Sequence, residues 1–572
     1  MKKLSEMISD RNVAICKIGK FQEDFQYVFD WVHPTCYIDD SYSEKTYNEL
    51  PVHRVSELGE APSPLFIIIC DLEAHKADVK GREWQCFGEL GLEWGKDYVF
   101  ADELFSELDF DYRTKIRGRK IAYWGTGNPA RQLLLSGLPS KYDLEPALFI
   151  NGTAKSGDTI NGIKVVSPKE IKETVRDYYV IVLPTYYYYE IQQNLREMGA
   201  EEYEDFAPSE FVFDLTHKKP SEMMRKTVYD KPLCKQPFCR YPFDELFLHS
   251  DGATFLCWCN DFIKMHYAQF GNWYAQPFES LWTSNAAKIF RLAILNNTFS
   301  FCDEHMCESM VPYREEDVLA RRKQAPQATD KPSTLFVSID GTCNLKCPSC
   351  RTHSVVYTER FRKNREAMIE RLHASGLLDS LDNLYMAGIG EVFFNQTYRS
   401  ILYHDGAKKR KSISLISNGT LFTEEEFQHL KDNYEEIRTI RISVDGMTEA
   451  TLKKLRPGLH FDTFVANLRN LGLHRQRGEI EKFILQCVVQ MDNLYELKDI
   501  VRFGQEIHAD EVLLMHMNNR VGYADAEFEA MSVETFEGDL KPEAAEILSD
   551  PIFDAEIVSM PWFKSRLNGE NV

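Results

Sequence analysis

Residues 334–350 read TLFVSIDGTCNLKCPSC and join a predicted strand to three closely spaced cysteines. The apolar run 334–339 predicts the strand, and the chain then reaches Cys343, Cys347 and Cys350 in a C-x3-C-x2-C pattern. Structural zinc usually has four protein ligands, often in C-x2-C or C-x4-C pairs, so this trio indicates a different metal centre. Three thiolates suit a [4Fe-4S] cluster in which one iron has no protein ligand.

Five further apolar segments follow in order, and each leads to small or polar residues. The segments cover 383–390, 412–416, 439–444, 482–490 and 511–515. Alternation of such strands with helical stretches predicts a partial (β/α)6 TIM-type barrel within a mixed α/β fold. The polar residues then lie at the carboxyl ends of the strands, where barrel active sites are built.

With these motifs, Thr334 to Tyr523 resembles the radical S-adenosylmethionine (SAM) superfamily. The resemblance implies that the open iron chelates SAM and that reduction yields a 5'-deoxyadenosyl radical, which abstracts a substrate hydrogen. One departure is Ser349, since many relatives carry an aromatic residue there that packs on adenine. The resemblance implies that Gly388, Gly390 and Glu391 lie at the SAM amino group, and that Ser417, Asn418, Ser443 and Asp445 lie towards the ribose and carboxylate. Arg456 is expected near the carboxylate, and Asn493 is a further cofactor-binding candidate. Ser417, Ser443 and Asp445 also suit simple turns, and Arg456 also suits a solvated helix end.

A second cysteine group precedes the barrel. Cys239, Gly252 and Cys257 form a C-x12-G-x4-C pattern that resembles the opening of a SPASM domain, and Trp282 and Arg291 resemble residues before its closing cysteines. The resemblance implies one auxiliary [4Fe-4S] cluster on Cys239, Cys257, Cys302 and Cys307, with Cys259 as the substitute ligand. SPASM domains usually follow the barrel, whereas here the order is reversed. Tetrahedral zinc is the alternative for this site.

The N-terminal part contains an internal repeat of about 95 residues. The copies run from Asn12 to Phe105 and from Lys120 to Phe213, and each predicts a small parallel α/β unit. The second copy has a G-x-G-x-x-A turn at 125–130 but Asn151 where a ribose-binding acid is expected, while the first has Asp39 without the turn. Each copy carries only half of the dinucleotide-binding motif, which is weak evidence that a nucleotide binds. We therefore favour a role in recognition or assembly for these two units. The segment after Lys218, up to Pro232, is interpreted as a linker.

These observations predict five regions. They are Rossmann-like units at 1–110 and 111–218, a SPASM-like domain at 228–313, a radical SAM barrel at 330–525 and an extension at 526–572.

Composition limits the partners. The net charge of -21 argues against nucleic acid, whose phosphates require clustered Lys and Arg. No signal peptide or membrane span is recognised, so we expect a cytoplasmic protein whose 14 cysteines serve as thiols or metal ligands.

The leading hypothesis is oxidation or epimerisation of a sugar-like or cyclitol substrate, because the N-terminal units resemble domains found beside sugar and polysaccharide biosynthesis enzymes. Cys259 or Cys487 is the candidate hydrogen donor of an epimerase, although Cys487 also suits a buried thiol. The alternatives are modification of a ribosomally made peptide, with no winged-helix recognition pattern found, and a non-catalytic iron-sulfur scaffold. A reductant such as flavodoxin or ferredoxin is the expected protein partner.

Overall fold

The chain forms two compact units, which are described separately. A computed structural model describes residues 3–71, 84–109, 115–116, 118–183, 188–209, 212, 219–230, 239–250, 252, 254–257, 271, 273, 276–302, 329–351, 359–387, 390–403, 409–519, 523–535 and 538–567. The first unit comprises residues 1–243 with 259–330, and the second comprises 244–258 with 331–572. Parallel strands dominate the sheets, so the predicted α/β class is confirmed.

The first unit opens with two six-stranded sheets of the same topology. Their orders are β3-β4-β2-β1-β5-β6 and β9-β10-β8-β7-β11-β12, and in each the outermost pair at one edge is antiparallel. The internal repeat predicts this equivalence. Central strands such as β1 (Asn12–Cys16) and β7 (Lys120–Trp124) are almost wholly buried, as strands covered on both faces must be. The other strands are β2 (Cys36–Ile38), β3 (Thr46–Tyr47), β4 (Leu50–His53), β5 (Leu65–Ile69), β6 (Tyr98–Phe100), β8 (Leu148–Ile150), β9 (Thr159–Ile160), β10 (Ile163–Val166), β11 (Tyr178–Val182) and β12 (Phe206–Pro208).

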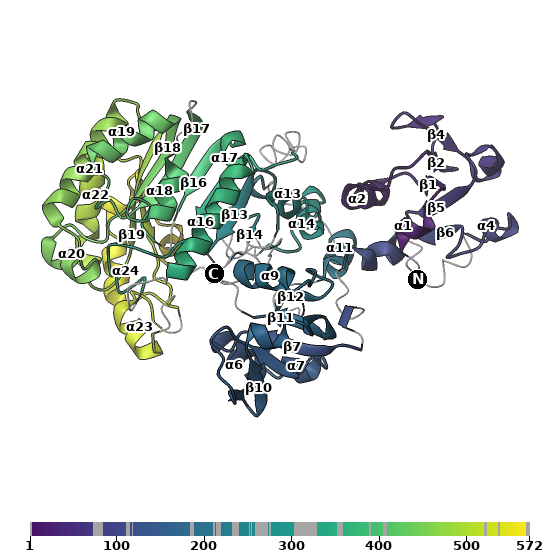
Figure 1. Ribbon diagram of the computed structural model, residues 1–572. Coiled ribbons are helices and arrows are strands. Elements are labelled where there is room, and N and C mark those ends of the chain that lie inside the picture. Colours follow the sequence, from purple (N-terminus) through teal and green to yellow (C-terminus); the bar gives the residue numbers. More distant parts are fainter. Residues whose placement is uncertain are drawn as a thin grey trace. The chain divides into compact units, whose positions relative to one another are not determined.

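Short helices accompany these sheets (Figure 1). In the first copy they are α1 (Leu4–Met7), α2 (Lys20–Val28), η1 (Val55–Glu60), α4 (Gln85–Glu89) and η3 (Ala101–Leu108). In the second copy they are α6 (Asn128–Leu135), α7 (Leu138–Lys141), α8 (Pro168–Ile171), η4 (Val175–Asp177) and α9 (Tyr188–Glu197).

The segment interpreted as a linker is partly a helix, so that prediction is wrong for residues 220–229. Helix α11 (Pro220–Tyr229) starts with a proline, which is favourable in a first helical turn, and buries Met223 and Met224. It packs against η3 and against α14 (Asn285–Leu295). The remaining helices of this region are α12 (Tyr241–Asp244) and α13 (Phe278–Trp282).

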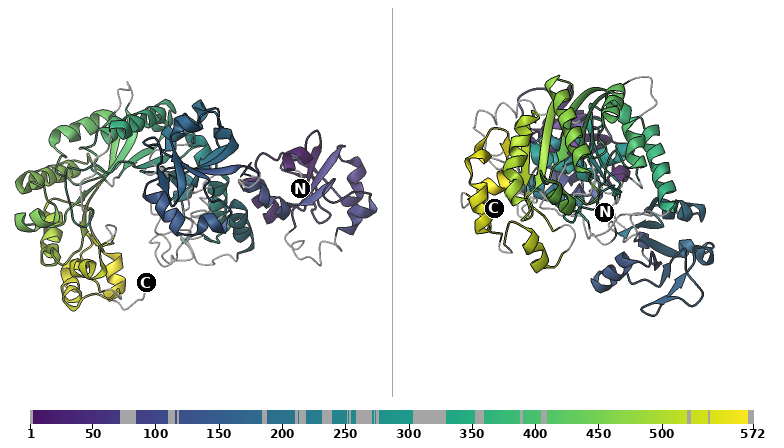
Figure 2. Two further views of the ribbon diagram at one scale, coloured as in Figure 1. Left: turned by 60° about the horizontal axis from the view of Figure 1, so that its bottom comes forward. Right: turned by 90° about the vertical axis from the view of Figure 1, so that its left-hand side faces the viewer.

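The second unit is built on a nine-stranded sheet of order β14-β13-β15-β16-β17-β18-β19-β20-β21. All neighbours are parallel except the hairpin of β13 and β14. Figure 2 shows these strands curving, with helices along the outer side. The strands are β13 (Glu245–His249), β14 (Thr254–Phe255), β15 (Thr334–Ser338), β16 (Asn383–Met386), β17 (Arg410–Ser417), β18 (Tyr434–Ser443), β19 (Lys482–Val488), β20 (Glu511–Met515) and β21 (Val558–Ser559).

Helices of the second unit connect these strands. They are α16 (Glu359–Ala374), α17 (Leu377–Ser380), α18 (Gln396–Leu402), α19 (Glu424–Asn433), α20 (Glu449–Leu455), α21 (Phe461–Gln476), η8 (Leu494–Glu496), α22 (Leu497–Glu506), α23 (Asp525–Met531), α24 (Pro542–Leu548), η9 (Pro551–Asp554) and α25 (Pro561–Leu567).

The hairpin of β13 and β14 extends the sheet before its first barrel strand. Both strands lie inside the predicted SPASM-like range 228–313, yet β13 pairs with β15 over five residues. Rings reinforce this junction: Phe247 stacks on Phe336 at 4.3 Å between centroids, and Phe336 stacks on Tyr385 at 4.6 Å. Part of the cysteine-rich segment therefore belongs structurally to the barrel sheet.

Among the described residues, no helix combines the length and the apolarity needed to cross a bilayer.

Candidate functional site

The three cysteines lie on the loop that leaves the carboxyl end of β15. Tight turns shape this loop, because the backbone N–H groups of Cys350 and Arg351 both donate to the Cys347 carbonyl at 3.0 Å. The Leu345 N–H donates to the Cys343 sulfur at 3.4 Å. Burial raises the pKa of the Cys343 and Cys347 thiols, so a positive partner is needed to hold them as thiolates.

Two glycines let neighbouring backbone approach this loop. A Cβ on Gly390 would lie 2.4 Å from the Thr342 oxygen and 2.5 Å from the Asp340 oxygen. Gly458 has φ +103°, and a Cβ there would lie 3.2 Å from the Asn344 oxygen. Gly390 is required by the close contact and Gly458 by its positive φ, so these two positions fix how closely the loop is enclosed.

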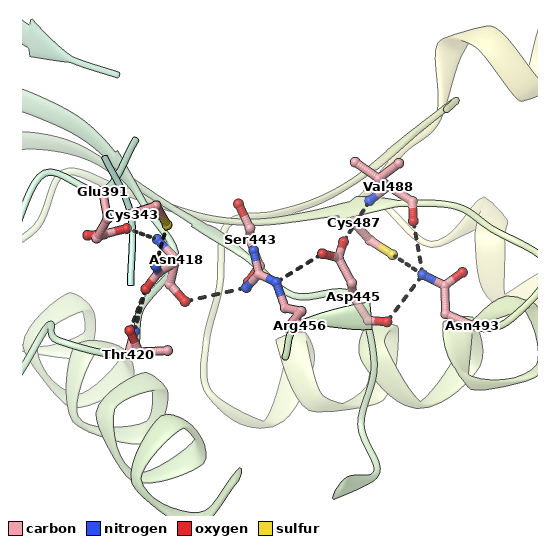
Figure 3. Close-up of polar contacts among 10 residues, drawn as sticks. All are labelled: Cys343, Glu391, Asn418, Thr420, Ser443, Asp445, Arg456, Cys487, Val488 and Asn493. Atoms are coloured by element: carbon pink, nitrogen blue, oxygen red, sulfur yellow. Dashed lines mark hydrogen bonds and ion pairs between the residues drawn. The ribbon is translucent and has the colours of Figure 1, made fainter. Parts of the chain in front are cut away.

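Glu391 ties the carboxyl end of β17 to the cysteine loop, because its N–H donates to the Thr342 carbonyl at 2.9 Å. Its fully buried carboxylate accepts hydrogen bonds from the Ser417 hydroxyl and the Asn418 N–H, both at 2.7 Å. The Asn418 amide in turn contacts the Cys343 sulfur at 3.7 Å (Figure 3). It also donates to Asn344 at 2.8 Å. Burial raises the pKa of Glu391 against the effect of these hydrogen bonds. The carboxylate therefore positions the loop beside β17.

A second network follows β18 and β19 (Figure 3). Arg456 and Asp445 form a buried ion pair with Nε 3.0 Å from Oδ2, and Arg456 also donates to the Ser443 carbonyl. Burial lowers the pKa of Arg456, but Asp445 and the Cys347 sulfur outweigh it, so the pKa is raised. The guanidinium thus supplies positive charge next to Cys347. It is buried, in contrast to the interpretation of Arg456 as a solvated helix end.

Asn493 and Cys487 complete this network. The Asn493 amide donates to the carbonyls of Val488 at 2.9 Å and Asp445 at 3.2 Å, and contacts the Cys487 sulfur at 3.6 Å. The Cys487 thiol is fully buried, and burial raises its pKa well above the usual value. This environment is the one expected of a packed structural thiol.

Several site residues were not singled out from the sequence. Asn344 donates to Thr420 at 2.8 Å and so links the cysteine loop to β17. The Tyr523 hydroxyl donates to the Pro348 carbonyl at 3.1 Å from beyond β20. Arg351 donates to the Cys350 sulfur at 3.4 Å. Position next to a cysteine was the signal available for Asn344 and Arg351, whereas Tyr523 has no such signal.

The three thiols of this loop are the kind of donors that a [4Fe-4S] cluster uses. Within the described part of the chain, no three His, Cys, Asp or Glu side chains lie close enough to hold one metal ion. In a [4Fe-4S] cluster each cysteine thiolate binds a different iron, so the sulfurs need not meet at one point. Three thiols on one loop, enclosed by Gly390 and Gly458, therefore fit a [4Fe-4S] cluster.

The predicted auxiliary ligands are only partly described. In the first unit, Cys239 and Cys302 pack against one small core made of Phe243, Ile294 and Phe299. Cys257 follows β14 in the second unit. Gly388, Cys259 and Cys307 lie outside the described residues.

Arg291 and Trp282 form a buried pair beside the core that holds Cys239. The guanidinium lies 4.0 Å from the indole centroid and donates to the Trp282 and Pro242 carbonyls at 2.8 and 2.7 Å. Burial lowers the pKa of Arg291 to about 10. The two residues that resemble the SPASM pattern are therefore in direct contact.

In the α/β repeats the candidate nucleotide-binding side chains bond locally. Asp39 accepts from the Ile18 N–H at 2.8 Å and from Ser41, which lowers its pKa despite burial. Asn151 donates to the Thr126 hydroxyl and accepts from the Thr153 N–H at 2.9 Å. Each copy thus uses the residue after its second strand to close a turn.

Comparison with known families agrees with this geometry. Residues 337–504 match the family model of the Radical SAM superfamily, and residues 239–308 match that of the iron-sulfur cluster-binding SPASM domain. The chain therefore contains a radical SAM domain and a SPASM domain, and these domains imply SAM, a [4Fe-4S] cluster and an auxiliary cluster as cofactors. Residues 117–205 match the "C2185-like, N-terminal" family.

Solved structures resemble part of the chain. The structure of anSMEcpe with bound AdoMet is 21% identical with a TM-score of 0.27, covering 42% of this chain and 62% of that one. Streptococcus suis SuiB bound to precursor peptide SuiA is 15% identical with a TM-score of 0.28, covering 53% and 67%. The match thus spans less than two thirds of the anSMEcpe chain. No curated protein matches this sequence.

Proposed function

We propose that this protein reductively cleaves SAM at a cluster held by Cys343, Cys347 and Cys350 and uses the resulting 5'-deoxyadenosyl radical to abstract a substrate hydrogen. The observation that carries this proposal is the enclosed loop of three thiols, tied by Asn418 and Glu391 to the carboxyl ends of the barrel strands. The buried polar residues arranged around the loop argue against a non-catalytic scaffold, because a purely structural cluster does not require them.

The chain's own residues would bind the clusters, enclose the cysteine loop, favour the thiolates and contact SAM. The three cysteines hold the cluster, and Gly390 lets backbone pack closely against their loop. Arg456 places positive charge beside Cys347, which favours the thiolate. Ser443, Asp445 and Asn493 border the same strand ends, so SAM contacts from these residues, and from Gly388, Ser417 and Asn418, remain part of the proposal. Cys239, Cys257, Cys302 and Cys307, with Cys259 as substitute, are the proposed auxiliary ligands.

The substrate class is the open part of the proposal. Two of the similar proteins are seen with bound peptides, SuiB with precursor peptide SuiA and anSMEcpe with the Kp18Cys peptide. The peptide alternative thus agrees better with the comparisons than oxidation or epimerisation of a sugar-like substrate does. A reductant such as flavodoxin or ferredoxin is the expected electron donor.

Anaerobic reconstitution tests the reaction class. Two [4Fe-4S] clusters, or about eight irons per chain, are expected, and 5'-deoxyadenosine should form from SAM under dithionite. Replacing Cys343, Cys347 and Cys350 by Ala should halve the iron and abolish 5'-deoxyadenosine. The proposal fails if the loaded wild-type protein never cleaves SAM. If four irons and zinc are found instead of eight irons, the auxiliary cluster is excluded. The proposal of SAM cleavage at the first cluster is then unaffected.

Deuterated candidates then separate the substrate classes. Peptides and sugars deuterated at carbon are incubated with the reduced protein and SAM, and deuterium in 5'-deoxyadenosine identifies the abstracted hydrogen. Transfer from a peptide would support the alternative, and transfer from a sugar would restore the first hypothesis.

A further inference from the structure

Arg351 joins the two ends of the cysteine loop. One of its terminal nitrogens donates to the Gly341 carbonyl at 2.6 Å, just before the loop, and the other donates to the Cys350 sulfur at 3.4 Å. A planar guanidinium can make both bonds at once because its donors have a fixed fork geometry. The side chain therefore fixes where the third sulfur stands relative to the start of the loop.

The contact also brings a permanent positive charge to a sulfur ligand. Hydrogen bonds to cluster sulfurs and the local net charge are two determinants of an iron-sulfur reduction potential. A donor and a cation on the sulfur both stabilise the more negative, reduced state.

Arg456 is arranged differently, although it also lies near a cysteine of the loop. Its charge is balanced by Asp445, with Nε and Oδ2 3.0 Å apart and both side chains buried. Arg456 also interacts with the Cys347 sulfur. Arg351 differs because its other terminal nitrogen bonds the Gly341 carbonyl of the same loop, so its contact with sulfur is fixed by the loop itself.

We propose that Arg351 is a positioning residue that holds the Cys350 sulfur and raises the reduction potential of the cluster at this loop. The inference rests on the proposed function for the presence of that cluster. It concerns a single reversible step in which the reductant gives one electron to the cluster, with no proton or group transferred. The bond from Arg351 makes that electron easier to accept.

The test is a redox titration of the full-length, anaerobically reconstituted protein followed by electron paramagnetic resonance. Addition of SAM identifies the signal of the cluster with the open iron, because only that signal should change. Arg351→Gln keeps a donor but loses the charge, and Arg351→Lys keeps the charge but loses the fork. Arg502→Gln, in an exposed ion pair with Asp499 on α22, is the matched control.

We expect Arg351→Gln to disfavour reduction of the SAM-sensitive cluster about tenfold, equal to a shift of about 59 mV towards negative potential for one electron. Arg351→Lys should shift it less, and Arg502→Gln should leave it unchanged. Unchanged potentials in both Arg351 variants at full iron content would overturn the inference while leaving SAM cleavage by the wild type intact. If Arg351→Gln is folded but loses iron, Arg351→Lys decides, since a negative shift supports the inference and no shift overturns it.

Discussion

At the scale of single residues, Gly390 decides how closely the cysteine loop is enclosed. An alanine there would press its methyl group against the oxygens of Thr342 and Asp340. Such overpacking costs about 1–3 kcal/mol and displaces backbone. We expect Gly390→Ala to lower the iron bound at this loop, measured by iron analysis after reconstitution. Gly59→Ala is the control, because a Cβ at Gly59 meets nothing within 4 Å. An unchanged iron content in Gly390→Ala would contradict this prediction. It would mean that the loop can shift to accommodate the methyl group and still bind the cluster.

A pH effect on stability is expected at Glu424. Hydrogen bonds from Asn470, His474 and Gln428 lower its pKa from the usual 4.5 to about 2. A depressed carboxyl pKa stabilises the fold above the unfolded value, and this contribution disappears as pH falls from about 4.5 towards 2. Glu424→Gln should therefore flatten the decrease in unfolding free energy over that window. Denaturant unfolding at stepped pH measures it.

The control for this effect is Glu425→Gln, one residue along the same first turn of α19. That variant should retain the wild-type pH dependence. Equal slopes for Glu424→Gln and the wild type would contradict the assignment.

The sequence predicts the reactive cysteines at this scale but not what surrounds them. C-x3-C-x2-C is a local pattern, so Cys343, Cys347 and Cys350 are recognisable without a fold. The contact of Asn418 with Cys343 joins residues 75 positions apart, and no local rule predicts which strand ends meet. The contacts of Tyr523 and Arg456 also depend on the tertiary fold. For this reason Tyr523 was not predicted, and the sequence was equally compatible with a solvent-exposed Arg456.

At the scale of elements, β13 is held to the barrel sheet by stacked rings. Phe247, Phe336 and Tyr385 occupy neighbouring strands in register. Aromatic pairs contribute about 0.5–1.5 kcal/mol beyond their buried area. A double-mutant cycle with Phe247→Ala and Phe336→Ala should thus give a coupling of this size in urea unfolding. Phe247→Ala combined with Phe503→Ala on α22 should be additive, and additivity in both cycles would exclude stacking as the stabilising contact.

Strands were predicted well because they are short apolar runs in a repeated order. The runs at 334–339 and 511–515 coincide closely with β15 and β20. Helix α11 was missed because its charged residues and Pro220 suggested a linker, whereas its stability comes from burying Met223 and Met224 against other helices. Membership of β13 in the barrel sheet is likewise a tertiary property that cysteine spacing does not contain.

At the scale of the whole molecule, the two units should respond differently to loss of the cluster. A cofactor that binds only the folded state stabilises the unit that holds it, and multidomain chains need not unfold in one step. Scanning calorimetry of the Cys343, Cys347 and Cys350 triple-alanine variant should show one transition at lower temperature and another unchanged. Equal shifts of all transitions would mean that the units unfold together.

The route of the chain has a consequence for its synthesis. β13 leaves the ribosome 89 residues before β15, its parallel partner, since Glu245 pairs with Thr334. Translation proceeds at about 5–20 residues per second. For several seconds, therefore, the backbone N–H and C=O groups on the β15 side of β13 have no partner strand. Nascent chains stalled between these two strands are thus the stage at which a chaperone would be most needed.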